Sequence, residues 1–180
     1  MTTSPTADRR VRDATAADAA ACAGIYAPYV RDTTVSFETE PPGAAEMAGR
    51  IAAAQQRHAW LVLEQQGQVV GYAYGGEFKA RPAYRFACEV SVYLDLEHRG
   101  TGGGRTLYTA LFDRLRQRGY RTVAGGMTLP NEASAGLHRA LGFTPVGTWR
   151  RVGWKQDAWH DVSWFQLDLV AGDEPPGELV

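Results

Sequence analysis

Apolar residues recur at helical spacing in four stretches of the chain. The clearest stretch covers residues 104–118, where leucines every four residues form one stripe and arginines fall mostly outside it. Gly119 follows directly and predicts the end of this helix. The same spacing predicts three more helices, near residues 15–29, 47–54 and 132–141.

Short runs rich in β-branched and aromatic residues predict a sheet. Strands are predicted over residues 60–64, 69–74, 88–94 and 121–127, with two more within residues 143–169. The first two flank Gln66 and Gly67, a pair that favours a hairpin turn. Because helices and strands intermix along the chain, the pattern predicts a mixed sheet with helices on its faces, an α/β (α+β layered) domain.

Length, charge and cysteine content narrow the class of protein. A chain of 180 residues fits one domain, which we expect to span residues 11–169 with flexible ends at 1–10 and 170–180. The formal net charge of −1 leaves no basic surplus for nucleic acid, and no stretch approaches the roughly 20 apolar residues of a membrane span. With no apolar signal segment at the start, and only Cys22 and Cys88, we expect a cytoplasmic protein.

A glycine-rich segment, residues 99–104, lies between a predicted strand and the helix that starts near Gly104. Glycines let the backbone approach a ligand and helix N-terminal amides attract anions, so this loop is a candidate phosphate site. The dinucleotide fingerprint needs a glycine where Arg105 stands, and the Walker loop needs a lysine there. The pattern Arg-x-x-Gly-x-Gly is met by Arg99, Gly102 and Gly104, and a merely flexible turn is the alternative.

That last pattern resembles the pyrophosphate signature of the Gcn5-related N-acetyltransferases (GNAT). Separated motifs in one register, over about residues 11–168, resemble the phosphinothricin N-acetyltransferase family more specifically. They cover residues 34–40, 78–81, 92–93, 106–109, 129–131, 137–138, 140–142 and 159–162. The resemblance implies the GNAT fold, with a mostly antiparallel central sheet flanked by helices on both faces. It also implies acetyl-CoA as donor, a primary amine as acceptor, and commonly a homodimer.

The resemblance further implies a donor site around the glycine loop. The loop amides would hold the pyrophosphate of acetyl-CoA, and backbone groups of the preceding strand would pair with the pantetheine arm. The residues so implied are Val92, Tyr93, Leu94, Arg99, Gly100, Thr101, Gly102, Gly103, Gly104 and Arg105, with Asn131 and Ser134 on a nearby helix. Gly100 departs from the family pattern, because relatives often carry an arginine there.

Acetyl transfer requires a neutral amine, so some group must take its proton. Glu89 is the candidate that the resemblance implies, and a surface glutamate is the alternative. His138 is the second candidate, as base or as proton donor to the departing thiolate, because it shares a helical stripe with Asn131 and Ser134. The alternative for His138 is a plain, partly buried histidine.

The other reactive side chains receive no catalytic role. Strand alternation turns Cys88 away from the face of Glu89, so we expect a core residue rather than a covalent acetyl carrier. Direct attack in a ternary complex is therefore the mechanism we favour. Spacing gives no role to His58, His98 or His160, and no His and Cys cluster resembles a metal site.

For the acceptor, the resemblance implies Lys79, Arg81 and Tyr84 as binding residues and Phe37 as a pocket wall. An arginine fork suits a carboxylate or phosphinate, so an amino-acid-like acceptor fits. Charges in a solvated loop are the alternative for Lys79 and Arg81. The tryptophans of the strand-rich end are expected in the core or in a dimer interface: Trp149, Trp154, Trp159 and Trp164.

We therefore predict an acetyl-CoA-dependent, metal-independent N-acetyltransferase for the α-amine of phosphinothricin-like or methionine-sulfoximine-like amino acids. The nearest alternative is acetylation of another small amine or of a protein N-terminus. A CoA-binding module without catalysis is a rival of another class, against which the presence of Glu89 and His138 argues. A nucleotide-dependent phosphotransferase comes last, because the loop lacks the phosphate-binding lysine.

Overall fold

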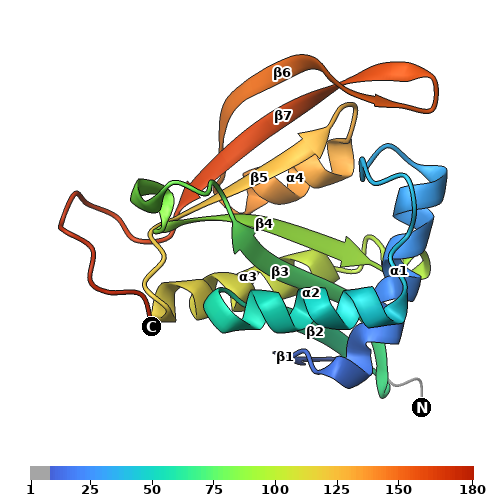
Figure 1. Ribbon diagram of the computed structural model, residues 1–180, viewed down its shortest axis with the longest axis horizontal. Helices are drawn as coiled ribbons and strands as arrows, with labels where there is room; N and C mark the ends of the chain where they lie inside the picture. The colour runs from blue at the N-terminus through green and yellow to red at the C-terminus, as the bar shows by residue number, and fades with distance from the viewer. Residues whose placement is uncertain (1–8) are drawn as a thin grey trace.

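The predicted strands and one further strand, β1, join one mixed sheet in the order β1-β2-β3-β4-β5-β7-β6 (Figure 1). This computed structural model describes residues 9–180. The strands are β1 (Arg9–Asp13), β2 (Trp60–Gln65), β3 (Gln68–Glu77), β4 (Ala87–Leu94), β5 (Thr122–Thr128), β6 (Thr144–Lys155) and β7 (Ala158–Asp168). The helices are α1 (Ala19–Asp32), α2 (Ala44–Arg57), α3 (Gly103–Gln117) and α4 (Glu132–Ala140), with 3₁₀ turns at Ala16–Asp18, Pro82–Tyr84 and Leu96–His98. The layered α/β fold class is thereby confirmed.

β1 corrects the expected boundary of the folded domain. Arg9 and Arg10, expected in a flexible N-terminus, pair with Gln65 and Glu64 of β2. The segment contains Val11 as its one apolar side chain, so no alternation marks it as a strand, and such charged segments suit the edge of a sheet. The remainder of the expected N-terminal tail, residues 1–8, lies outside the described residues.

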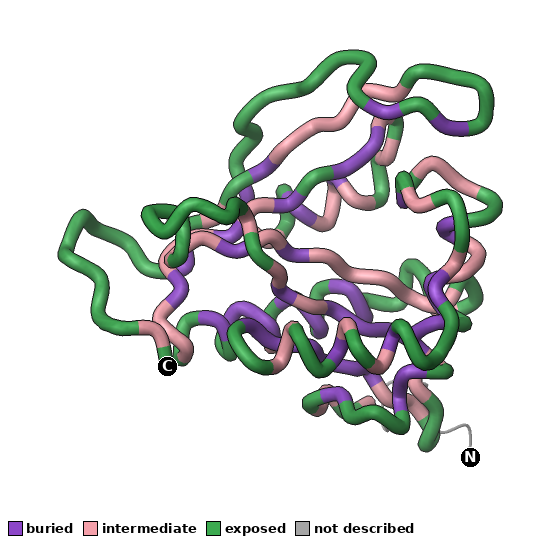
Figure 2. Tube along the Cα trace, in the orientation of Figure 1, coloured by how far each residue is buried: buried purple, intermediate pink, exposed green. Residues whose placement is uncertain are grey.

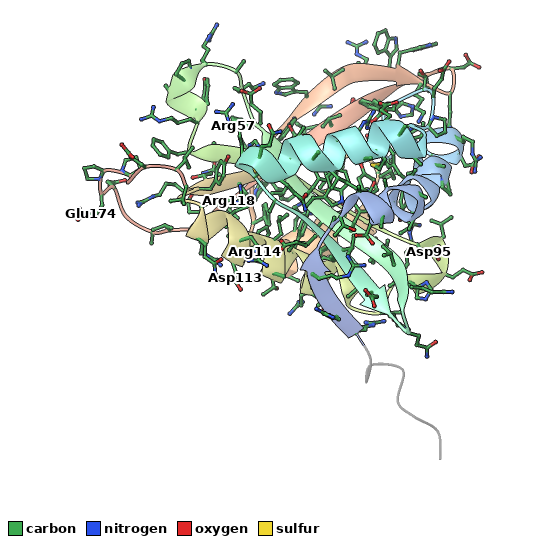
Figure 3. All side chains as sticks on the ribbon, turned by 60° about the horizontal axis from the view of Figure 1, so that its bottom comes forward. Arg57, Asp95, Asp113, Arg114, Arg118 and Glu174 are labelled. Carbon is green, nitrogen blue, oxygen red and sulfur yellow. The ribbon has the colours of Figure 1, made fainter. Side chains whose placement is uncertain are left out.

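Two apolar cores lie on opposite faces of the sheet. The predicted leucine stripe of α3 is confirmed, since Leu107, Leu111 and Leu115 are fully buried against one face. Asp113 and Arg114 project from the opposite side of α3 into solvent (Figure 3). On the second face, α1 and α2 pack over aromatic and aliphatic side chains of β2 and β3: Trp60, Val62 and Tyr72. In the described part of the chain, no helix has the length and apolarity needed to cross a bilayer.

Within residues 9–180, β4 and β5 form the one parallel pair, and they stay together over only three residues each, 87–89 with 122–124. Beyond that point β4 continues along β3, and β5 continues along β7. The two strands therefore diverge in the middle of the sheet (Figure 1). The edge of β4 that faces β5 is left without a strand partner from Val90 to Leu94.

β6 and β7 form a long hairpin that extends away from the rest of the sheet (Figure 1). Exposed residues dominate this hairpin (Figure 2). Trp149, Trp154 and Trp159 are each more than half exposed, so the expectation of a core position is wrong for these three. A two-stranded hairpin buries at most one face, and no helix of the described chain covers the other face here.

The chain returns to the domain after β7. Leu179 packs against the core beneath α3, and the amide of Val180 donates to the carbonyl of Arg118 at 3.1 Å. Residues 170–180 therefore contact the folded domain without forming a helix or strand, and their flexibility stays a prediction.

Candidate active site

A narrow cleft of about 60 Å³ lies where β4 and β5 diverge. The unpaired end of β4 forms one wall, through Val92 and Tyr93, and the first turns of α4 form another. From α4, the predicted stripe of Asn131, Ser134 and His138 lines the cleft together. The structure thus brings Val92, Tyr93, Asn131 and Ser134 to one opening in the sheet, whereas Leu94, also expected at the donor site, does not line it.

The glycine loop leads into α3 beside this cleft. Gly100 and Gly102 have φ of +71° and +82°, in the left-handed region that favours glycine. The first helical hydrogen bond runs from the Thr106 amide to the Gly102 carbonyl at 3.1 Å. The amides of residues 103–105 precede it and lack intrahelical acceptors, so they and the positive end of the α3 dipole form a site for an anion.

The adjacent glycines serve packing as well. A Cβ at Gly103 would meet Leu63 at 2.9 Å, and a Cβ at Gly104 would meet Leu137 of α4 at 3.1 Å. A larger residue at Gly104 would therefore press on the contact between α3 and α4. A Gly104→Val exchange would therefore disturb the packing of the fold as well as the loop.

Neighbouring side chains hold the loop in place. Arg9 of β1 donates to the Thr101 carbonyl at 2.6 Å. Arg99 lies over the Tyr29 ring, 4.9 Å from its centroid, and its Nε donates to the Tyr29 hydroxyl at 3.2 Å. That hydroxyl in turn donates to the Leu94 carbonyl at 2.6 Å. The Leu94 carbonyl is therefore engaged by α1, while the loop amides remain free for a ligand.

Glu89 lies where the parallel pairing ends, opposite Ala124. Its side chain lines a second cavity, of about 290 Å³, which shares Val35, Gly126 and Met127 with the cleft between β4 and β5. Burial raises the pKa of the Glu89 carboxyl above its ordinary 4.5, and the charge of Lys79 partly opposes this rise. An acceptor in this cavity would thus meet a half-buried carboxylate beside the donor cleft.

The cavity around Glu89 is otherwise mostly apolar. Its remaining walls come from the α1–α2 connection, from β5 and from the β6–β7 hairpin: Phe37, Thr128, Trp149, Val152, Val162 and Trp164. Phe37, which the resemblance implied as a pocket wall, lines the same cavity as Glu89, and its role toward an acceptor stays a prediction.

His138 is buried at 3% exposure among the rings of Tyr108, Phe143 and Phe165. Its Nδ1 lies 2.8 Å from the Ser134 carbonyl, so this nitrogen carries the proton and Nε2 has the lone pair. Within the described chain Nε2 has no hydrogen-bond partner, and it points at Gly125 of β5. Burial lowers the pKa of His138, so the ring is neutral at neutral pH.

The remaining cysteine and histidines contribute to packing. Cys88 has no exposed surface, and burial raises the pKa of its thiol to about 12, as expected for a core residue. His58 stacks on Tyr120, and His98 lies 3.2 Å from Asp95. His160 contacts the carbonyl of Lys155 at 2.9 Å.

The residues expected to bind the acceptor are brought together only in part. Lys79 lies over Trp149, 5.9 Å from the ring centroid, in a cavity of about 240 Å³ next to that of Glu89. Tyr84 is 42% exposed and packs on Phe78. Arg81 is exposed and lines neither cavity. The roles of Arg81 and Tyr84 therefore stay predictions.

Sequence reasoning missed the β5 residues of the site. Gly125 and Gly126 are adjacent in a strand, where glycines often mark a close approach of other groups. A Cβ at Gly125 would collide with the His138 ring, and one at Gly126 would lie 3.1 Å from the Trp164 ring. This glycine pair was the available signal for a site on β5.

The comparisons with known proteins identify the family of this chain. The family model described as an acetyltransferase (GNAT) domain matches residues 11–164. A phosphinothricin N-acetyltransferase of Streptomyces viridochromogenes is 43% identical over 88% of this chain and 87% of its own length. An L-methionine sulfoximine/L-methionine sulfone acetyltransferase of Pseudomonas paraeruginosa is 36% identical over 88% and 94%.

A solved structure shares the fold. The phosphinothricin acetyltransferase of Sinorhizobium meliloti in complex with AcCoA superposes with a TM-score of 0.90 and 36% identity, covering 95% of this chain and 94% of that one. The predicted family resemblance is confirmed, and this chain belongs to the GNAT acetyltransferase family.

Proposed function

We propose that this GNAT enzyme transfers the acetyl group of acetyl-CoA to the α-amine of a small amino acid. The observation that carries the proposal is the junction of two openings. The donor cleft between β4 and β5 shares three lining residues with the cavity that contains Glu89. An acceptor amine beside Glu89 would therefore lie next to a group held in the cleft.

The residues present fit acetyl-CoA. The amides of residues 103–105 and the positive φ of Gly102 suit the pyrophosphate, and the edge of β4 without a strand partner, between Val90 and Leu94, suits the amide groups of the pantetheine arm. When bound, acetyl-CoA supplies the activated acetyl group. We propose the loop, β4, Asn131 and Ser134 as the donor-binding residues.

Glu89 is the proposed base. Burial raises the pKa of its carboxyl, which makes the carboxylate a stronger base, and the cavity has room for a water that it would order against the incoming ammonium. The neutral amine can then attack directly, without a covalent carrier, because the buried Cys88 is held as a thiol. His138 is the second candidate for the base, since its ring lies under β5 among aromatic rings.

The proposed acceptors are phosphinothricin-like and methionine-sulfoximine-like amino acids. The names of the two relatives support this class. The charge of Lys79 at the neighbouring cavity suits an anionic group of such an acceptor, and the apolar walls suit its aliphatic part.

A homodimer is the proposed assembly, with a cytoplasmic location. Trp149, Trp154 and Trp159 expose large apolar surfaces on one hairpin, and large apolar patches of this kind mark protein interfaces. A sedimentation measurement of wild type against Trp154→Asp tests the assembly. A monomeric wild type would contradict it.

The test of the activity is thiol release from acetyl-CoA across a panel of amines. The panel contains phosphinothricin, methionine sulfoximine, common amino acids and a peptide with a free N-terminus. We expect the highest kcat/KM with the first two. A preference for the peptide would favour N-terminal acetylation, and CoA binding without thiol release would indicate a silent binding module.

A further inference from the structure

Lys155 is a buried cation at the end of β6. The residue is 8% exposed. Its Nζ donates to two backbone carbonyls, that of Val30 at 2.6 Å and that of Ser36 at 2.7 Å. Among residues 9–180, no carboxylate forms an ion pair with it. Burying an ammonium group is costly, so its two acceptors offset a large desolvation penalty.

The two carbonyls belong to the start of the α1–α2 connection. Val30 lies in the last turn of α1, where the carbonyls lack helical donors and the helix dipole favours a cation. Ser36 lies in the connecting segment, which has no regular secondary structure. Lys155 therefore joins the end of the β6–β7 hairpin to a loop more than 100 residues earlier in the chain, and the two lie close together in Figure 1.

The same loop is anchored from its other side by α1 and α2. The Tyr26 hydroxyl lies 2.6 Å from the Ser36 hydroxyl and also donates to Glu38 at 2.9 Å. Arg50 of α2 binds both oxygens of Glu38, at 2.7 and 2.9 Å. Ser36 is thus held by its hydroxyl from α1 and by its carbonyl from Lys155.

Between these anchored residues, Phe37 projects toward the hairpin. Its ring lies against the backbone of Gly153, where a Cβ would overlap it, and 6.3 Å from the His160 ring. Phe37 and Val35 form walls of the Glu89 cavity, and Val35 also lines the donor cleft. The geometry of both walls therefore depends on how the Ser36 backbone is held.

We propose that Lys155 is a positioning residue for the acceptor, which sets Val35 and Phe37 over the Glu89 cavity by binding the Ser36 and Val30 carbonyls. The inference rests on the proposed function in assigning that cavity to the acceptor. Lys155 touches neither the cavity nor the glycine loop, so its effect is confined to the loop wall.

The test compares Lys155→Met, which keeps the length and apolar stem but removes the donor, with Arg150→Met, an exposed cation of the same strand. In Lys155→Met we expect the acceptor KM to rise about tenfold, as for a lost charged hydrogen bond, with kcat and the Kd of CoA changed less, because Val35 is the one residue of this loop that lines the donor cleft. Lys155→Arg, which keeps donors and charge, should recover part of the loss. Arg150→Met should match wild type.

A second readout does not require activity. Hydrogen exchange of the amides of residues 34–38 should speed up in Lys155→Met, while the amides of α3 keep their protection. If Lys155→Met does not fold, Tyr26→Phe loosens Ser36 from the other side and should raise the acceptor KM in the same way. A lower melting temperature with unchanged acceptor KM and unchanged exchange at residues 34–38 would overturn the proposal. If wild type acetylates no amine while exchange at residues 34–38 is still faster in Lys155→Met than in wild type, the proposed function is overturned instead.

Discussion

The Glu89 carboxylate and the His138 imidazole lie on opposite faces of the sheet. Glu89 shares its face of β4 with Tyr93, which packs on the core of α1 and α2. His138 lies under the other face, with its ring against Tyr108 and Phe165 of the α3 core. Because the strands diverge beside Glu89, the cleft is the place where both faces become accessible to one ligand.

This arrangement gives Glu89 the larger catalytic effect. Glu89→Gln keeps the shape of the side chain but removes the base, so kcat/KM for the best amine should fall about 10²–10⁴-fold at neutral pH. The Kd of CoA should stay unchanged, because the glycine loop is intact. Steady-state kinetics and calorimetry check this. A variant with near-wild-type kcat/KM would show that Glu89 does not move the proton.

The raised pKa of Glu89 predicts the acid side of the pH–rate profile. Because protonated Glu89 cannot serve as a base, kcat/KM should fall as pH drops, with a midpoint above the ordinary 4.5. Lys79→Met removes the charge that lowers this pKa, so the midpoint should move to higher pH. Arg81→Met is the comparison, since Arg81 does not line the Glu89 cavity and should leave the midpoint in place.

The variant Arg81→Met also tests acceptor binding. If Arg81 grips the anionic group of the acceptor, Arg81→Met should raise the acceptor KM roughly ten- to 150-fold without changing CoA binding. An unchanged KM would mean that Arg81 is a solvated loop charge. Its exposed position in the structure agrees with that alternative.

Burial of His138 predicts a dependence of stability on pH. Its folded-state pKa is lowered, so the unfolded chain binds a proton first as pH falls below about 6.5. Stability is therefore full above that pH and declines below it, with a similar contribution from His58, whose pKa burial also lowers. In His138→Asn the melting temperature should be lower at pH 7.5 but should decline less between pH 7 and pH 5. An equally steep decline would contradict a neutral, buried His138.

Several features of this fold follow directly from local sequence. The stripe of Leu107, Leu111 and Leu115 predicts α3 and its buried side, because periodicity alone decides which face packs on a sheet. Strand alternation likewise separates Glu89 from Cys88. These inferences need no knowledge of distant parts of the chain.

Other features depend on partners that local sequence does not show. Lys155 binds backbone carbonyls 125 and 119 residues away. Every residue has a backbone carbonyl, so the sequence does not indicate which ones act as acceptors. Trp149 and Trp159 have the composition of core residues, yet they are exposed because no helix of the described chain covers their hairpin. The orientation of His138 Nε2 toward Gly125 follows from the packing of α4 on β5, which the stripe with Ser134 does not specify.

Gly102 offers a test that separates backbone strain from ligand approach. Its φ of +82° disfavours other residues, but a Cβ there would meet no protein atom within 4 Å. Gly102→Ala should cost about 1–2 kcal/mol of stability from the left-handed backbone, whereas Gly102→Asn should cost less, because asparagine tolerates this region. If the loop amides bind the CoA pyrophosphate closely, both side chains should obstruct it and raise the Kd of CoA about tenfold or more, whatever their effect on stability.

Gly49→Ala on α2, also with open space and without a positive φ, is the matched control and should leave CoA binding unchanged. Calorimetry and thermal melts on the four proteins decide the outcome: a loss of CoA affinity in Gly102→Ala that Gly102→Asn does not share would mean that glycine is needed for the turn and not for the approach of the ligand.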